Sequence, residues 1–145
     1  MIGKCGAYHS YVPLGLRNIT FDCAHPTDLA RWWTRVTGWE EDPGNPNLPE
    51  DDEAALVAPD RSSNLLFVKV PEAKEVKNRV HLDLQPTDGT RDDEVMRLVA
   101  LGATVVADRR RPDGAGWVVM ADPEGNEFCV ERSTKERAAA PPPPS

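Results

Sequence analysis

Residues 116–130 read GWVVMADPEGNEFCV, two apolar runs separated by the turn sequence DPEGN at residues 122–126. Proline fixes its own φ and glycine tolerates positive φ, so this combination favours a tight reversal of the chain. Apolar runs that flank such a reversal are typical of paired strands, and the stretch therefore predicts a β-hairpin. Alternation in its second strand places Glu127, Cys129 and Glu131 on one face, and Phe128 and Val130 on the other.

A second alternating stretch, RVHLDLQ at residues 79–85, predicts another strand. Its apolar face carries Val80, Leu82 and Leu84, and its polar face carries His81, Asp83 and Gln85. Such a polar face either lies in solvent or forms the floor of a polar pocket, in which a metal could also bind. The rest of the sequence is needed to choose between these possibilities.

The predicted elements occur twice in the same order, which is a strand, a helix and then two or three strands. In the first half they lie at residues 16–24, 25–39, 54–58 and 64–70. In the second half they lie at residues 79–85, 92–102, 103–107, 116–121 and 127–132. Corresponding positions are 62 to 64 residues apart, so order and spacing agree and predict a duplicated module.

The two predicted modules are expected to pack together, because neither can cover the apolar face of its own sheet. The helices cover the face that carries residues such as Ile19, Phe21 and Leu82, and the opposite face then curves into a cup. The side chains that alternation assigns to the cup are Asn18, Thr20, Asp22, His81, Asp83, Gln85, Glu127, Cys129 and Glu131.

The composition of the 145-residue chain disfavours several classes of protein. No apolar run approaches the length of a membrane span, and residues 1–15 have no secretory signal pattern, so we expect a cytoplasmic protein. The net charge of −7 would repel phosphate backbones, and a turn directly follows the one basic cluster, Arg109–Arg111, which disfavours nucleic-acid binding. Cys5, Cys23 and Cys129 are odd in number and lack CxxC spacing, so we expect free thiols.

The duplicated order, the motif KNRVHLDL at residues 77–84 and above all GWVVMADPEGNEFCV resemble the glyoxalase-like branch of the vicinal oxygen chelate superfamily. The similarity extends over about residues 16 to 132. It implies an α+β fold of two tandem βαβββ modules, residues 16–71 and 78–132, that form an eight-stranded, cup-shaped mixed sheet with helices on the outer face. It also implies a small-molecule ligand in the cup, often with a divalent metal, and commonly a homodimer.

The resemblance places the superfamily's metal positions on Asn18, Phe67, His81 and Cys129. His81 is a usual metal ligand, whereas Phe67 has no donor atom and Asn18 is a weak neutral donor. Because a catalytic divalent metal needs about three protein donors, we expect no cofactor. The alternatives for Cys129 are a thiolate ligand in a rearranged site with His81 and Glu127 or Glu131, or a small buried residue of the sheet.

His81, Asp83 and Glu127 are the candidate catalytic residues, because titratable groups that share a partly dry cavity shift each other's pKa and act as acid and base. A general base beside an acidic C–H group would allow lyase or isomerase chemistry without a metal. Alternatively, His81 is only a hydrogen-bonded residue at the rim of the sheet. The candidate ligand-binding residues are Asn18, Asp22, Trp39, Trp117, Cys129 and Glu131, while Lys74, Lys77 and Arg79 either are solvated or bind an anionic substrate.

Two functions are therefore expected for the cup. The first is an enzyme of the glyoxalase-like type that acts on a small oxygenated metabolite. The second is a non-catalytic protein of the bleomycin-resistance type that binds or sequesters a small molecule, whereas a cup filled by its own side chains would indicate a partner-recognition domain. Outside the cup, residues 1–15 are predicted to be an N-terminal extension and residues 133–145, STKERAAAPPPPS, a disordered Ala/Pro-rich tail.

Overall fold

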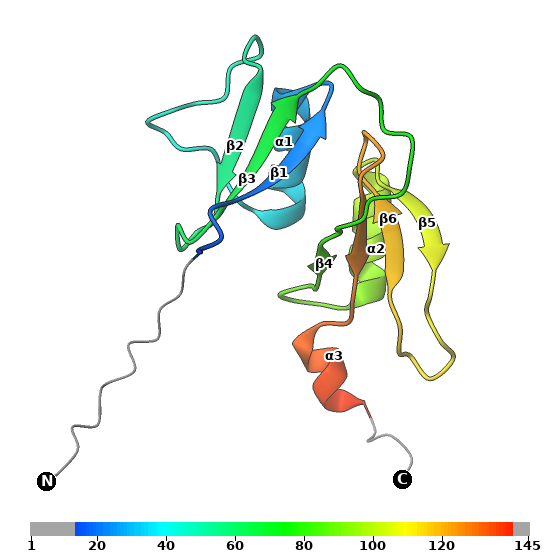
Figure 1. Ribbon diagram of the computed structural model, residues 1–145. Helices are drawn as coiled ribbons and strands as arrows, with labels where there is room; N and C mark the ends of the chain where they lie inside the picture. Colours follow the sequence, from blue (N-terminus) through cyan, green and yellow to red (C-terminus); the bar gives the residue numbers. More distant parts are fainter. Residues whose placement is uncertain (1–13, 141–145) are drawn as a thin grey trace, which may run out of the picture.

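The computed structural model describes residues 14–140, which contain three helices and seven strands (Figure 1). The first module contains β1 (Asn18–Cys23), α1 (Pro26–Thr37), β2 (Glu53–Val57) and β3 (Asn64–Lys69). The second module contains β4 (Asp83–Leu84), α2 (Arg91–Ala100), β5 (Thr104–Asp108), β6 (Val118–Ala121) and β7 (Glu127–Val130). A short helix, α3 (Thr134–Ala139), follows the second module.

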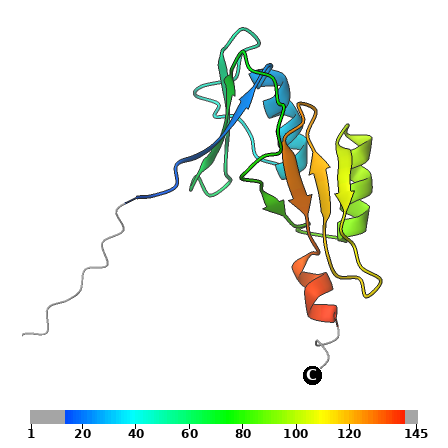
Figure 2. The same ribbon diagram turned by 45° about the vertical axis from the view of Figure 1, so that its right-hand side comes forward.

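The strands form two sheets that are built in the same way. β1 pairs in parallel with β3, which is antiparallel to β2, while β4 pairs in parallel with β7, which continues antiparallel to β6 and then β5. α1 packs on β2 and β3, and α2 contacts β7. In the view of Figure 2, α2 (yellow-green) runs alongside the second sheet. The α+β class and the repeated order are therefore present, but the described strands form a three-stranded and a four-stranded sheet rather than one eight-stranded cup.

The first module lacks the fourth strand that a βαβββ unit contains. At the corresponding place, Glu40 forms only an isolated bridge with Val57 of β2. Three prolines follow this bridge, at positions 43, 46 and 49. Because proline has no backbone N–H to donate, this segment does not continue a hydrogen-bonded ladder along β2.

The strand predicted at residues 79–85 is shortened to the two residues of β4. Pairing with β7 sets Asp83 opposite Cys129. In this register Val80 would have to pair with Asn126, which belongs to the connection before β7. Val80 is consequently 79% exposed, and the prediction that it belongs to the covered apolar face is wrong.

The turn between β6 and β7 also connects the two modules. The Asp122 carboxylate is 2% exposed and accepts a hydrogen bond from the indole Nε1 of Trp33 in α1 at 3.1 Å. The Glu124 carboxylate accepts hydrogen bonds from the backbone N–H groups of Ala24 and His25, at 2.6 and 3.1 Å. Since the His25 side chain does not cap α1, Glu124 supplies the acceptors and the negative charge at the start of this helix.

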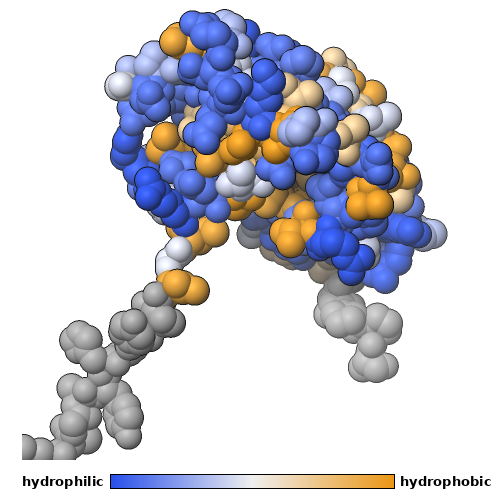
Figure 3. All heavy atoms as spheres, turned by 45° about the horizontal axis from the view of Figure 1, so that its top comes forward, coloured by the Kyte–Doolittle hydropathy of each residue, from blue (hydrophilic) through white to orange (hydrophobic). Residues whose placement is uncertain are grey.

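A single hydrophobic core joins both modules. The fully buried ring of Trp33 lies 5.1 Å from Phe21 and 5.3 Å from Phe128, measured between ring centroids. Trp32 packs in the same cluster and donates from Nε1 to the carbonyl of Leu101 at 2.8 Å. The modules therefore pack together, with apolar side chains between them, while the face in Figure 3 is mainly hydrophilic with separate hydrophobic groups.

The residues that follow the second module are not all disordered, contrary to the prediction for residues 133–145. Ser133 and Glu136 form a capping box at the start of α3, in which each side chain accepts a hydrogen bond from the backbone N–H of the other residue. Glu136 also accepts a hydrogen bond from the backbone N–H of Arg91 at 2.9 Å. Local capping together with this contact to α2 explains why the segment is helical.

Some predictions lie outside the described residues. They concern most of the N-terminal extension, which includes Cys5, and the proline run at residues 141–144. Within residues 14–140, no helix combines the length and the hydrophobicity that spanning a bilayer requires.

Candidate functional site

A hollow of about 380 Å³ lies over the polar face of β4 and β7, and we name it the His81 pocket. Its lining residues are Lys77, His81, Asp83, Arg109, Trp117, Val119, Glu127, Cys129 and Glu131. They come from the connector between the modules, from β4, from the loop between β5 and β6, and from β6 and β7. The volume and the mixture of apolar and polar walls fit a small-molecule site.

His81 lies beside Asp83 and Cys129 in this pocket. Its Nδ1 is 3.2 Å from Asp83 Oδ1 and 3.7 Å from Cys129 Sγ. When Nδ1–H donates to Asp83, Nε2 carries the lone pair, and this nitrogen has no hydrogen-bond partner among residues 14–140. The arrangement leaves one imidazole nitrogen free to accept a proton from a ligand.

The register of β4 and β7 explains why these three side chains meet. Asp83 is opposite Cys129, and opposite residues of paired strands direct their side chains to the same face. The backbone N–H of Cys129 donates to the carbonyl of Leu82 at 2.8 Å, so the pairing extends one residue before β4. This extension brings His81 next to Cys129.

The Cys129 thiol is protonated at neutral pH. Burial, together with the negative charge of Asp83, raises the pKa of Cys129 to about 11. Because the thiolate is the nucleophilic form of cysteine, Cys129 is a poor nucleophile under these conditions. It contributes a small, polarizable and neutral group to the pocket.

Glu127, one of the candidate catalytic residues, is engaged by the connector. Its carboxylate accepts a hydrogen bond from the backbone N–H of Asn78 at 3.0 Å and forms an ion pair with Lys74 at 3.1 Å. Burial acts to raise the pKa of Glu127, but the contacts with Asn78 and Lys74 outweigh it, and the pKa is lowered. Glu127 is therefore ionised at neutral pH and holds the connector beside His81.

A larger cavity of about 590 Å³ adjoins the His81 pocket. Thr20 and Asp22 of β1 line it together with the connector, and His81 and Glu127 line both hollows. Asp22 thus shares a cavity with His81 although β1 belongs to the other sheet.

Asn18 and Trp39 line neither hollow. The Oδ1 of Asn18 accepts a hydrogen bond from Asn64 Nδ2 at 3.0 Å within the first sheet. Trp39 packs against the hydrophobic core and lines a separate hollow that also contains Gln85. Because β1 pairs with β3 and not with β4, the polar faces of the two modules do not form one continuous sheet surface, and Asn18 stays apart from His81.

The metal positions implied by the resemblance do not form a complete site. Phe67 is fully buried in the core, and the Asn18 side chain is engaged within the first module. A different set of donors, in His81, Asp83 and Cys129, offers one ligand atom per residue, all within 4.8 Å of one another. These donor types suit zinc, although a divalent ion would first have to displace the Cys129 proton.

Arg109 is a site residue that the sequence pattern did not indicate, since residues 109–111 were predicted only to be a basic cluster. In the structure the backbone N–H of Arg109 donates to the carbonyl of Trp117 at 2.9 Å, which places both residues at the same edge of the His81 pocket. Pairing the two predicted strands that flank this loop would have set Arg109 beside Trp117. That pairing is the signal from which Arg109 could have been found.

Comparison with known proteins agrees with this architecture. A family model described as a glyoxalase-like domain matches residues 18–131. No curated protein matches the chain. A solved structure of a possible glyoxalase from Bacillus cereus is 16% identical, covers 81% of this chain and 98% of that chain, and has a TM-score of 0.58.

Two further solved structures are similar. A mutant of the fosfomycin resistance protein FosX from Listeria monocytogenes, complexed with Mn(II) and 1S,2S-dihydroxypropylphosphonic acid, is 18% identical over 86% of this chain and 96% of that chain, with a TM-score of 0.61. A glyoxalase/bleomycin resistance protein/dioxygenase family enzyme from Burkholderia phytofirmans PsJN is 18% identical over 81% of this chain and 97% of that chain, with a TM-score of 0.62. The repeated strand order, the shared fold and the match over residues 18–131 show that the chain belongs to the glyoxalase-like domain family of the vicinal oxygen chelate superfamily.

Proposed function

We propose that the chain binds a small oxygenated molecule in the His81 pocket and that His81 exchanges a proton with it. The observation that carries this proposal is the 3.2 Å contact between His81 Nδ1 and Asp83 Oδ1 beside a hollow of about 380 Å³. A carboxylate at Nδ1 orients the ring and stabilises the imidazolium that forms when Nε2 takes a proton. The similar FosX structure contains a dihydroxypropylphosphonic acid, which is a ligand of this size class.

Proton transfer by His81 supports lyase or isomerase chemistry at a carbon next to a carbonyl group. In this step the C–H bond breaks, its proton moves to His81 Nε2, and the electron pair moves to the carbonyl oxygen to form an enolate. Lys77 and Arg109 at the wall of the pocket supply positive charge for that oxygen. Return of the proton to another face or carbon, or departure of a leaving group, then completes isomerisation or elimination.

We further propose that this chemistry needs no resident metal, because Phe67 and Asn18 supply no donor to the pocket. Metal analysis of the purified chain tests this point, and we expect less than about half a metal ion per chain. A higher content that is lost in His81→Ala would show that the cluster of His81, Asp83 and Cys129 holds a divalent ion instead.

Deuterium exchange tests the proton transfer itself. The protein is incubated in D₂O with a panel of small carbonyl compounds, and proton NMR follows loss of the C–H signal next to the carbonyl. We expect wild-type protein to accelerate exchange and His81→Gln to slow it about 100-fold, the usual effect of losing a general base.

The matched control is His25→Gln, since His25 is exposed and lies outside the His81 pocket. We expect this control to exchange as fast as wild type. Exchange by His81→Gln within about threefold of the wild-type rate would contradict the proposed role of His81, because a lost general base lowers rates far more.

Non-catalytic binding is the second candidate function, and Trp117 favours it. Its indole is 45% exposed and lines the His81 pocket, where it can stack on a ligand without any proton transfer. Calorimetric titration of the same compounds separates the two functions. Tight binding with no exchange, weakened by Trp117→Ala, would identify a binding or sequestering protein.

We also propose a homodimer, the assembly that the resemblance implies. β5 is the edge strand of the second sheet, and its Val105 and Val106 are about half exposed. A second copy could cover such an apolar edge. Light scattering tests the assembly, and a monomeric mass at high protein concentration would contradict it.

A further inference from the structure

We propose that the chain has a built site for a doubly charged oxyanion, such as a phosphate group, directly beside the His81 pocket. A second hollow, of about 420 Å³, lies there, and we name it the arginine pocket. Its lining residues are Arg109, Arg111, Ala115, Gly116, Trp117, Glu131, Arg132 and Arg137. Four guanidinium groups and one carboxylate therefore surround one hollow in a chain whose net charge is −7.

Two of these guanidinium groups are available to a ligand. The side chains of Arg109 and Arg132 have no hydrogen-bond or ion-pair partner within the described part of the chain. Arg111 is only loosely paired, because its Nε is 3.6 Å from Asp113 and both side chains are exposed. Guanidinium groups that are not already neutralised bind carboxylates and phosphates through parallel hydrogen bonds.

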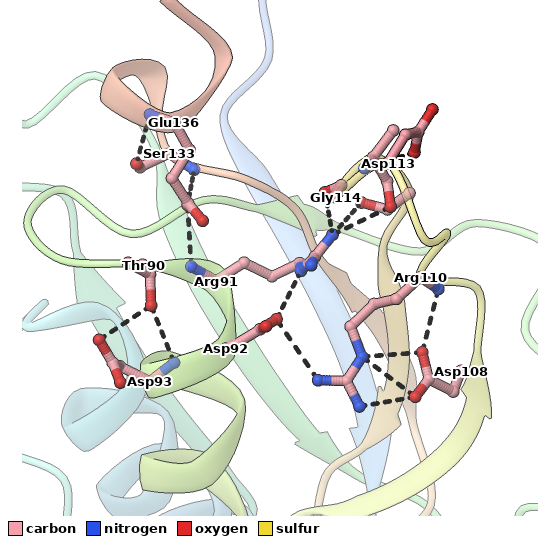
Figure 4. Close-up of polar contacts among 12 residues, drawn as sticks. Thr90, Arg91, Asp92, Asp93, Asp108, Arg110, Asp113, Gly114, Ser133 and Glu136 are labelled. Atoms are coloured by element: carbon pink, nitrogen blue, oxygen red, sulfur yellow. Dashed lines mark hydrogen bonds and ion pairs between the residues drawn. The ribbon is translucent and has the colours of Figure 1, made fainter. Parts of the chain in front are cut away.

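The arginines of the basic cluster at residues 109–111 do not all face the arginine pocket, because Arg110 is paired elsewhere. Its guanidinium forms ion pairs with Asp108 at 2.6 Å and with Asp92 at 3.4 Å (Figure 4). Arg110 is thus neutralised at the start of α2, while its sequence neighbours Arg109 and Arg111 line the arginine pocket. The structure separates three consecutive arginines into one structural and two ligand-accessible residues.

A buried clamp holds the loop that carries these arginines. Arg91 at the start of α2 is 4% exposed, and its Nη1 donates to the carbonyl oxygens of residues 114, 115 and 116 at 3.1, 3.2 and 2.9 Å (Figure 4). Its backbone N–H donates to Glu136 of α3. Arg91 therefore ties the loop and α3 together, so the backbone that carries the arginines is already positioned and loses less entropy on binding.

Gly116 allows the two sides of the loop to approach closely. Its φ is +90°, and a Cβ at this position would lie 2.0 Å from the carbonyl oxygen of Arg109. Only glycine fits such a conformation and such a contact. The close approach fixes Arg109 beside Trp117, at the border between the two hollows.

The arginine pocket and the His81 pocket share Arg109, Trp117 and Glu131, so one ligand can extend through both. We infer a small molecule with a phosphate-type group among the arginines and an oxygenated carbon beside His81. The second half of this inference rests on the proposed function, whereas the anion site does not. The two guanidinium groups without a partner and the loosely paired Arg111, against the one carboxylate that lines the pocket, favour a doubly charged group over a monocarboxylate.

Calorimetric titration of the full chain with inorganic phosphate tests the anion site. We expect saturable binding, weaker binding of acetate, and phosphate affinity at least about 10-fold lower in the double variant Arg109→Gln/Arg132→Gln. Because neither side chain has a partner within residues 14–140, the double variant should fold normally, which circular dichroism verifies. Glu131→Gln should strengthen phosphate binding, since it removes the one carboxylate of the pocket.

The matched control is Arg31→Gln, which removes an exposed arginine of α1 outside the arginine pocket and should change phosphate affinity less than about twofold. Equal phosphate affinity in wild type and the double variant would overturn the site, as would a heat signal no larger than that of chloride at the same ionic strength. His81→Gln separates the two proposals, because it should slow proton exchange about 100-fold and leave phosphate affinity unchanged. If wild type binds phosphate but does not accelerate exchange, the anion site stands and the proposed chemistry is rejected. If wild type accelerates exchange but does not bind phosphate, the proposed chemistry stands and the anion site is rejected.

Discussion

Removal of the buried Asp122 carboxylate should strongly destabilise the contact between the modules. This carboxylate accepts hydrogen bonds from Trp33 Nε1 at 3.1 Å and from the backbone N–H of Asn126 at 3.0 Å, and both donor residues are buried. Asp122→Ala leaves these donors without an acceptor, and each buried donor without a hydrogen bond costs ~1–3 kcal/mol. Burial raises the pKa of Asp122, so part of this loss is offset when the buried carboxylate is removed. We therefore expect the free energy of unfolding to fall by about 3 kcal/mol.

Urea unfolding followed by tryptophan fluorescence measures this loss. A matched control is Asp60→Ala, which removes a turn aspartate that also accepts a backbone hydrogen bond, from Ser62, but at an exposed position. Water can replace Asp60 as the acceptor, so the control should lose at most about 0.5 kcal/mol. If Asp122→Ala lowered the free energy of unfolding by less than about 1 kcal/mol, the reasoning would be refuted. Such a result would mean that the Trp33 and Asn126 donors find other acceptors.

Two further changes test neighbouring features of the fold. Glu124→Ala removes the acceptors for the Ala24 and His25 N–H groups at the start of α1, and because water can reach this position, urea unfolding should show a loss of only about 1 kcal/mol. Burial, followed by the charges of Glu124 and Asp122, raises the pKa of Cys23 from its ordinary value of 9.0 to about 11. The folded chain then holds this proton more tightly than the unfolded chain, so the free energy of unfolding should decrease between about pH 9 and pH 11, and Cys23→Ala should reduce that slope.

Alternation and turn chemistry predicted the parts of the fold that depend on near neighbours in the chain. β1, α1, β3 and the hairpin of β6 and β7 all lie within the predicted ranges, and β2 begins one residue before its predicted range. These features repeat every two or three to four residues, so the sequence shows them directly.

The predictions of secondary structure are wrong where strand pairing or helix capping outweighs the local hydrophobic pattern. The fourth strand of the first module does not form because three prolines interrupt its hydrogen-bonded ladder. β4 is short because its register with β7 leaves Val80 without a partner. The tail contains α3 because Ser133 and Glu136 form a capping box and Glu136 contacts α2. In each case the decisive partner is a particular backbone or side-chain group that hydrophobic alternation does not detect.

By itself, the sequence determined the duplicated order of elements, the polar and apolar faces of the strands and the family of the chain. Only the tertiary structure decided which polar residues meet. Cys129 and His81 are 48 positions apart and become neighbours through the register of β4 and β7, while Asn18 remains in the other sheet. Arg109, Arg132 and Arg137 likewise surround one hollow only because hydrogen bonds of Arg91 hold the β5–β6 loop and α3 in place. Such meetings depend on contacts between distant segments, which no local period in the sequence encodes.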